Sequence, residues 1–192
     1  MPAPNPAALD FLLTRRSRPA KTLVAPAPDR AALEPILTAA ARVPDHGKLE
    51  PWRFVVLERA ALDRLAAAAR ARAAELGRED PENDKDARQF ADSPLAVAVI
   101  EVQKPSEKIP ALEQTYSAGA ACLSLLNAAL ASGWGANWLS GWPAHDAAFG
   151  REALGLGDGE RVAGFIHIGT ERAAPPERPR PDLSAIVTWV SE

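Results

Sequence analysis

One segment, residues 111–132, constrains the fold of this chain more than any other, because it is apolar on nearly every side. Beyond Glu113 it carries no charged residue over about six helical turns, whereas a surface helix has a charged face. A helix of this kind must be enclosed, either at the centre of the molecule or between two subunits. We therefore expect residues 111–132 to form a buried helix, either in the core or in a subunit interface.

Short β-rich runs alternate with helical patterns along the rest of the chain. Because strands separated by helices favour layers, the pattern indicates an α/β or α+β domain with helices over a central sheet. Neither an internal repeat nor a linker divides the sequence, so residues 1–192 are predicted to form a single domain. The predicted strands are 52–57, 95–102, 136–140 and 162–169, and the predicted helices, besides 111–132, are 7–13, 30–41, 62–76 and 146–154.

Three further segments lie outside this alternation. Residues 77–86 are the most loop-like stretch, and we interpret them as a surface connection or a substrate lid. Residues 173–182 are too rich in proline to be regular. Residues 186–190 alternate in hydrophobicity and are predicted to form an edge strand.

Composition excludes several classes of protein. A net charge of −3 argues against a nucleic-acid binder that relies on a broad basic face. A single cysteine, Cys122, excludes an internal disulfide framework and a cysteine-rich zinc site. No apolar run reaches the ~18 residues of a membrane helix, and no secretory segment is visible. We therefore expect a soluble cytoplasmic protein without a membrane or nucleic-acid partner.

Several familiar motifs are missing. The series Gly155-x-Gly157-x-Gly159 lacks the third glycine of a dinucleotide fingerprint, and it precedes a predicted strand instead of following one. No P-loop lysine and no His-Glu-x-x-His helix is present, and the three histidines lack metal-ligand spacing. The sequence thus predicts no metal site and no Rossmann-type nucleotide site.

Polar groups gather instead at the ends of predicted elements. Arg15, Arg16, Ser17 and Arg18 place three guanidinium groups and a hydroxyl at a helix end. Arginine suits phosphate because its planar fork donates two hydrogen bonds at once, although a run of charges can also be a solvated helix terminus.

Two other clusters, at residues 42–46 and 138–142, can each be interpreted either as part of a binding site or as ordinary structure. Arg42 and His46 flank a proline-containing turn, which is compatible with a binding group or with an ordinary satisfied histidine. Residues 138–142 combine two indoles with a small flexible pair, and such aromatic residues can belong to a core or to a cofactor wall. Together with residues 15–18, the clusters could form one pocket.

Taken in order along the chain, these clusters resemble the FMN-dependent nitroreductase family, and most of all its small, short-chain branch. The resemblance extends from about residue 8 to residue 190, almost the whole chain. The motifs that carry it are Arg15-Arg16-Ser17, Arg42-x-Pro44-Asp45-His46, Pro51-Trp52-x-Phe54, Ser117-Ala118-Gly119, Trp138-x-Ser140-Gly141 and Gly164-Phe165-x-x-x-Gly169-Thr170.

The resemblance implies an α+β fold of three layers, with a mixed or antiparallel central sheet flanked by helices. It also implies an intertwined homodimer with FMN at the subunit interface, and a C-terminal extension, residues 173–192, that reaches the partner subunit. By the same resemblance, Arg15, Arg16 and Ser17 would hold the phosphate, the ribityl chain and the pyrimidine edge of FMN. Arg42 and His46 would reach that flavin from the other subunit.

The third motif would supply Trp138, Leu139 and Ser140 to line the isoalloxazine and ribityl side. Here the chain departs from the family that it resembles, whose similar members carry an arginine at the position of Leu139. A charge-assisted hydrogen bond contributes about 1.5–3 kcal/mol, so its loss would weaken phosphate binding unless another cation replaces it. The arginines considered as replacements are Arg18, Arg172 and Arg178.

The activity implied is an oxidoreductase reaction in two halves. NADH or NADPH would reduce FMN, and the flavin would then reduce a small acceptor such as a nitroaromatic compound or a quinone. No side chain is required as an acid or a base, so no catalytic residue is predicted. Two alternatives stay open: a flavin-binding dimer for storage or sensing with little turnover, and another flavin reaction on the same fold, such as enone reduction or dehalogenation.

Overall fold

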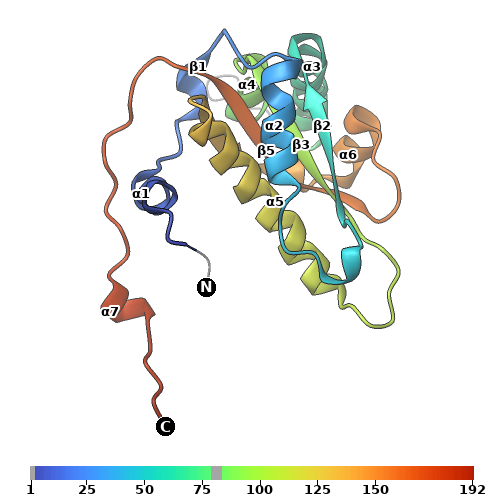
Figure 1. Ribbon diagram of the computed structural model, residues 1–192. Coiled ribbons are helices and arrows are strands. Elements are labelled where there is room, and N and C mark those ends of the chain that lie inside the picture. Colours follow the sequence, from blue (N-terminus) through green and yellow to red (C-terminus); the bar gives the residue numbers. More distant parts are fainter. Residues whose placement is uncertain (1–2, 79–83) are drawn as a thin grey trace.

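An antiparallel sheet of five strands runs through the middle of the computed structural model, which describes residues 3–78 and 84–192 (Figure 1). Its strands follow the order β1-β5-β3-β2, and β4 also pairs with β5. The strands are β1 (Leu23–Val24), β2 (Trp52–Leu57), β3 (Leu95–Val102), β4 (Gly135–Leu139) and β5 (Glu160–Glu171). The helices are α1 (Pro6–Thr14), α2 (Arg30–Ala40), α3 (Arg59–Glu75), α4 (Lys85–Ala91), α5 (Ala111–Ala131), α6 (Ala147–Leu154) and α7 (Leu183–Ile186).

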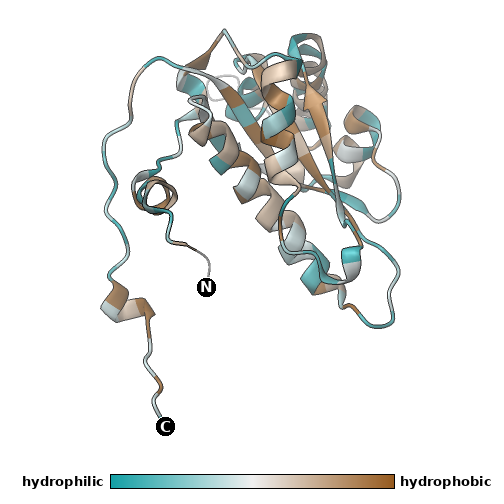
Figure 2. Cartoon of the chain, viewed as in Figure 1, coloured by the Kyte–Doolittle hydropathy of each residue, from teal (hydrophilic) through white to brown (hydrophobic). Residues whose placement is uncertain are grey.

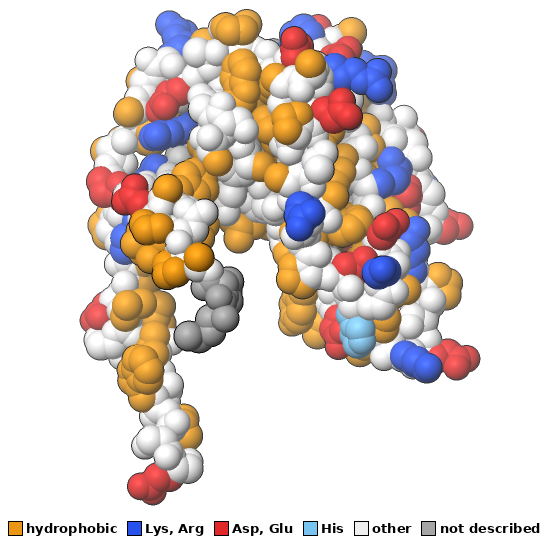
Figure 3. Space-filling model, viewed as in Figure 1, with side chains coloured by type: hydrophobic (Ala, Val, Ile, Leu, Met, Phe, Trp, Pro, Cys, Tyr) orange, Lys and Arg blue, Asp and Glu red, His pale blue; other side chains and the backbone are white. Residues whose placement is uncertain are grey.

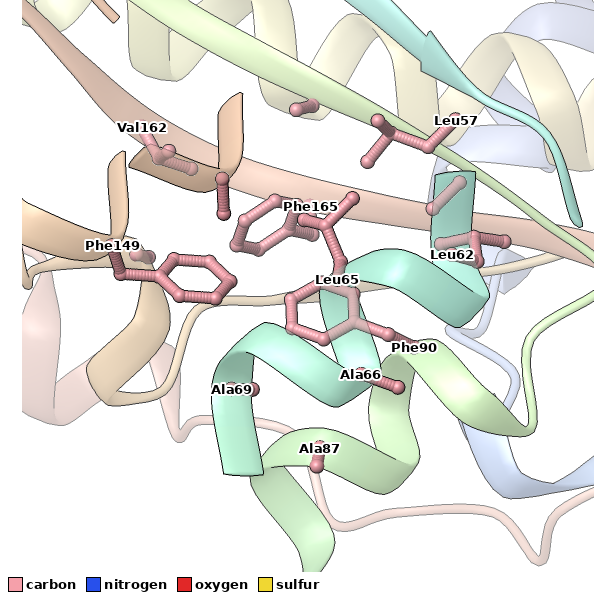
Figure 4. Close-up of a cluster of buried hydrophobic side chains, with 14 of the residues drawn as sticks. Leu57, Leu62, Leu65, Ala66, Ala69, Ala87, Phe90, Phe149, Val162 and Phe165 are labelled. Carbon is pink, nitrogen blue, oxygen red and sulfur yellow. The ribbon is translucent and has the colours of Figure 1, made fainter. Parts of the chain in front are cut away.

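The two faces of the sheet bury separate hydrophobic cores, because side chains along a strand alternate between its faces. Along β3, Ala96, Ala98 and Ile100 pack into the core beneath α3, α4 and α6, which is shown in Figure 4. Their neighbours Val97 and Val99 pack into the second core, beneath α2 and α5. Helices therefore cover both faces, and the prediction of an α+β fold with three layers is confirmed.

The long helix α5 is enclosed on one side only. Cys122 and Leu125 are fully buried against the sheet, and burial raises the pKa of the Cys122 thiol to about 12. On the opposite side Leu112, Tyr116 and Leu123 are 58%, 66% and 47% exposed. Within the single chain the sheet and α2 therefore cover only one face of α5, and the burial of the other face in a subunit interface stays a prediction.

Helix α4 was not predicted from the sequence. The loop expected over residues 77–86 ends at Asp84, where α4 begins with Lys85, while residues 79–83 of that predicted lid lie outside the described residues. Seven residues are too few to display a helical period. The helix is held by tertiary packing, since Ala87 and Phe90 enter the core beneath α3.

The predicted edge strand at residues 186–190 is also wrong. Asp182 caps α7 by accepting a hydrogen bond from the Ser184 amide at 3.0 Å, and the residues after Ile186 form no strand. A strand needs a neighbour to satisfy its amides and carbonyls, and this tail stands away from the body of the same chain (Figure 1). Its apolar residues are exposed, with Trp189 at 91%.

An ion pair joins the outer strand β2 to the start of β5. The Arg53 guanidinium donates to both carboxylate oxygens of Glu160, at 2.7 and 2.8 Å, and this hydrogen bonding lowers the pKa of Glu160 to about 2. Because the pKa is lower in the folded state than its usual 4.5, the pair stabilises the fold above that pH. This contribution disappears as the pH falls toward 2.

Replacing Arg53 by glutamine is therefore expected to lower the free energy of unfolding most at neutral pH. The difference from the parent protein should shrink steadily between pH 4.5 and 2, as measured by urea denaturation across that range. Asp63→Asn, which breaks a largely exposed pair with Arg59, is the control and should change little at any pH. An Arg53→Gln effect that does not depend on pH would contradict this account.

Candidate functional site

The arginine motif follows directly from the end of α1. Asn5 caps this helix by accepting a hydrogen bond from the Ala8 amide at 3.1 Å, and the helix ends at Thr14 because Arg15 has an extended backbone. The extended segment is then fastened to β4. The amide of Arg18 donates to the carbonyl of Ala136 at 2.8 Å, and the Asn137 side chain donates to the Arg18 carbonyl at 2.7 Å.

These two bonds fasten Arg18, the residue after the first predicted motif, to Ala136 and Asn137. Trp138, Leu139 and Ser140, the third motif, follow directly on Asn137. The Trp138 indole lies against Gly164 on the neighbouring strand, where any side chain would collide with it. The bonds join segments more than a hundred residues apart in the sequence, and the sharing of one pocket by the two motifs stays a prediction.

Arg15 and Arg16 present buried donors that no described group satisfies. The Nε atoms of both side chains are shielded from solvent and have no hydrogen-bond partner among the described residues. The Nη2 atom of Arg15 donates to the Ser17 hydroxyl at 3.0 Å. Because an unpaired buried donor is costly, an anion that accepts from both arginines would stabilise this arrangement.

A fourth arginine joins this group from the far end of the chain. The Arg180 guanidinium donates to the Arg15 carbonyl at 3.5 Å. Burial lowers the pKa of Arg15, and the charges of Arg180, Arg16 and Arg18 lower it further. We call Arg15, Arg16, Arg18 and Arg180 the arginine cluster. Repulsion within the cluster makes it a place where a phosphate dianion would be favoured.

Of the arginines predicted to replace the family arginine at position 139, Arg18 belongs to the arginine cluster. It pairs with Glu171 at 3.4 Å. Arg180 is also in the cluster, but the sequence analysis did not identify it. A proline-rich tail carries no sequence pattern that predicts which part of the fold it contacts. For Arg172 and Arg178, the structure gives no side-chain contact with this region.

Arg42 and His46 lie elsewhere in the chain. The turn that carries them is held by Asp45, which accepts from the amides of Leu49 and Glu50 at 3.1 and 2.9 Å. The His46 ring nitrogen Nδ1 lies 2.6 Å from the Glu113 carboxylate, in the first turn of α5. This pair is largely exposed, at 63% and 46% of the two side chains.

A single chain therefore does not bring all the predicted site residues together. His46 is attached to the beginning of α5, whereas Arg18 of the arginine cluster is bonded to β4, which follows the end of α5. A helix of 21 residues is about 30 Å long, so His46 and Arg18 are separated by roughly the length of α5. Arg42 lies nearer the middle of α5, because the Ala39 carbonyl just before it accepts a hydrogen bond from the Ser124 hydroxyl at 3.0 Å.

A cavity of about 460 Å³ opens beside the third motif. Leu139 and Asn137 form one wall, and the turn after the arginine motif and helix α4 form the others. Its complete lining is Pro19, Ala20, Lys21, Lys85, Arg88, Gln89, Asp92, Ser93, Asn137 and Leu139. The sequence analysis did not predict that residues of α4 line this cavity, because it did not predict α4 itself. Among the described residues, no cluster of potential metal ligands was found.

Comparison with known proteins agrees with this architecture. The sequence pattern of the Nitroreductase family matches residues 12–170. YdjA of Escherichia coli strain K12, named provisionally as an NAD(P)H nitroreductase, is 34% identical over 183 residues, which cover 95% of this chain and 98% of that protein. A nitroreductase-like family protein from Bacillus cereus superposes with a TM-score of 0.77 at 23% identity, over 99% of this chain and 98% of that one.

A second solved structure is also similar to this chain over almost its whole length. It comes from Desulfovibrio desulfuricans, is described provisionally as a nitroreductase in complex with FMN, and superposes with a TM-score of 0.76 at 23% identity. The superposition covers 98% of this chain and 99% of that one. The likeness therefore includes the whole layered fold and not a single motif.

Proposed function

The chain belongs to the nitroreductase family, and on this premise we propose that it is an FMN-dependent NAD(P)H oxidoreductase that works as a homodimer. The observation that supports this most directly is the pair of buried, unpartnered Nε donors on Arg15 and Arg16. A phosphate group is the natural acceptor for such donors. Trp138 in β4 and Ser140 just after it offer an aromatic surface and a hydroxyl, which suit the rest of a flavin nucleotide.

When bound, FMN would supply the redox chemistry by taking a hydride from NADH or NADPH and passing the electron pair to an acceptor. With a nitroaromatic acceptor the balance is NAD(P)H + H⁺ + ArNO₂ → NAD(P)⁺ + ArNO + H₂O. The part of this chain is to bind and orient. Arg15, Arg16 and Ser17 would hold the phosphate end, and Trp138, Leu139 and Ser140 would line the ring and ribityl side. A quinone is an equally suitable acceptor.

The homodimer is supported by apolar surface that the single chain leaves uncovered. Helix α1 has no buried residue, and its Leu9, Leu12 and Leu13 are 59%, 57% and 70% exposed. The uncovered face of α5 and the apolar residues of the tail add to this surface, which Figures 2 and 3 show along α1, α5 and α7. Exposed patches of this extent mark an interface, and a second copy of the chain offers the same surface in return.

A twofold arrangement would also complete the site. If the α5 helices of two subunits packed antiparallel, the beginning of one would lie beside the end of the other. Arg42 and His46 of one subunit would then approach the arginine cluster of its partner, although His46 lies roughly one α5 length away within its own chain. Residues 173–192 would extend onto the partner, where the tail finds the neighbour it lacks in its own chain.

We further propose a single domain over residues 1–192 and a cytoplasmic location. The two cores share one sheet, which supports one folding unit. Among the described residues, no helix is long and apolar enough to cross a membrane. NAD(P)H is available in the cytoplasm, and the lone Cys122 is buried and unpaired, as expected where thiols stay reduced.

The test is an absorption spectrum of the purified protein after addition of FMN and desalting, followed by anaerobic titration with NADPH and with NADH. We expect one FMN per subunit to be retained, and its visible bands to bleach with at least one nucleotide. Retained bands that neither nucleotide bleaches would contradict the oxidoreductase and favour a flavin-binding dimer. Loss of flavin on desalting would contradict the assignment of the pocket.

A further inference from the structure

The turn that carries His46 has a strained backbone. Gly47, Lys48 and Glu50 have positive φ angles of 71°, 55° and 47°, and two of these three residues are not glycine. A left-handed conformation is unfavourable for a residue with a side chain, so it persists only where surrounding contacts impose it. Such strain is often found where a functional side chain must be held at a defined position.

Contacts with α5 and with the loop before it impose this conformation, in addition to the Asp45 carboxylate inside the turn. The buried Ser117 hydroxyl, on α5, donates to the Pro44 carbonyl at 2.7 Å. Ile109, in the loop, packs so closely on Gly47 that any side chain at Gly47 would collide with it. The backbone of the turn is therefore fixed against the beginning of α5.

A single described contact orients the His46 ring on this turn. The side chain is 63% exposed, and Glu113 provides the one hydrogen bond that the ring makes to the described residues, with 2.6 Å between Nδ1 and Oε2. An ionised carboxylate can only accept hydrogen bonds, so the proton between these two atoms belongs to Nδ1. Nε2 is then the ring nitrogen that remains for another partner.

The place of Glu113 in its helix does not by itself explain this bond. A carboxylate in the first turn of α5 is favoured by the helix dipole, whatever lies beside it. The dipole does not require a bond to a side chain 67 positions earlier in the sequence. Glu113 therefore has a second possible role, which is to hold the His46 ring.

From this geometry we propose that Glu113 is a positioning residue of the shared cofactor site. By accepting from Nδ1 it fixes the tautomer and the orientation of the His46 ring, so that Nε2 is the atom offered to the FMN bound by the partner subunit. Glu113 itself does not touch the flavin. The inference rests on the proposed function, in which His46 reaches that flavin across the interface.

A double-mutant cycle tests whether Glu113 acts through His46. Fluorescence titration gives the dissociation constant for FMN of the parent, Glu113→Ala, His46→Ala and the double variant. Residues of one hydrogen-bond network are coupled, so Glu113→Ala should raise this constant about threefold or more in the parent, and should not raise it further in His46→Ala. A merely structural role in α5 would give the same effect in both backgrounds. The control is Glu152→Ala, which removes the same charge from an exposed position on α6 and should leave the affinity unchanged.

Nitrogen NMR of the histidine rings tests the tautomer directly in the FMN-loaded protein. The chain has three histidines, and the signals of His46 are those that His46→Ala removes. At alkaline pH, where an imidazole is neutral, we expect the ring proton of His46 on Nδ1 in the parent protein. In Glu113→Ala it should move to Nε2, the nitrogen that a neutral imidazole prefers to protonate in water.

Three results would overturn the inference. Equal effects of Glu113→Ala in both backgrounds would make Glu113 a structural residue of α5. A proton on Nε2 in the parent would show that Glu113 does not set the tautomer, and this result decides even if a variant does not fold. A monomeric Glu113→Ala, measured by light scattering, would assign the pair to dimerisation instead.

These failures differ from a failure of the proposed function. In each of the three cases the parent protein would still retain FMN, and its bands would still bleach with a nicotinamide nucleotide. A parent that retains no FMN would contradict the proposed function and the inference together. An FMN affinity that His46→Ala leaves unchanged would refute the shared site, and the role of Glu113 with it.

Discussion

Replacing Arg15 by glutamine is expected to raise the dissociation constant for FMN by about 10- to 100-fold, because one charge-assisted hydrogen bond to phosphate contributes about 1.5–3 kcal/mol. The same change should leave the protein without cofactor at least as stable as the parent. Burial and the neighbouring Arg180, Arg16 and Arg18 already disfavour the charged form of Arg15, as its lowered pKa indicates. A polar, uncharged side chain removes that repulsion.

Two measurements check this result. Fluorescence titration gives the affinity for FMN, and thermal unfolding of the FMN-free protein gives the stability. Arg151→Gln, an exposed arginine on α6, is the control for a general loss of positive charge and should alter neither quantity. Unchanged FMN affinity in Arg15→Gln would contradict the proposed phosphate site. Loss of both affinity and stability would show that the side chain is structural instead.

Replacing Leu123 by glutamate is expected to convert a homodimer into monomers and to abolish FMN retention with it. Leu123 lies on the uncovered face of α5 and is 47% exposed in the single chain. A carboxylate there would be buried without a partner in the dimer but solvated in the monomer, so it opposes association at a cost of several kcal/mol. Flavin would be lost because Arg42 and His46 are proposed to come from the partner.

Light scattering coupled to gel filtration gives the mass, and the absorption spectrum after desalting gives the flavin content. The matched control is Leu76→Glu, which introduces the same charge at a residue 37% exposed at the end of α3. It should stay dimeric and retain FMN. A monomeric parent protein would refute the proposed dimer outright, and a monomeric Leu123→Glu variant that still holds FMN would refute the shared site.

Much of the fold could be predicted from local signals. The bounds of β2 and β3 agree with the prediction, because continuous β-rich runs flanked by polar residues are unambiguous. Asp29 was expected to cap α2, and its side chain accepts a hydrogen bond from the Ala32 amide at 2.9 Å. Prediction was poorer for β1, only two residues long, and for α4, since neither is long enough to show a period.

Some residues of the candidate site could likewise be identified from the sequence, and others only from the structure. Arg15, Arg16 and Trp138 could be singled out because their residue types and the order of their motifs are local properties. The α4 side chains on the cavity and the return of Arg180 to the arginine cluster could not, because contacts across many residues leave no mark in a local pattern.

The sequence by itself determined the layered architecture and the family, since these depend on periodicity and on short ordered motifs. Tertiary structure decided which groups meet. Hydrogen bonds of Arg18 with Ala136 and Asn137 fasten the segment after the first motif to β4, while the length of α5 separates His46 from Arg18. It also decided what stays exposed, because the sheet covers one face of α5, and only the folded chain shows that its other face, α1 and the tail lack a partner.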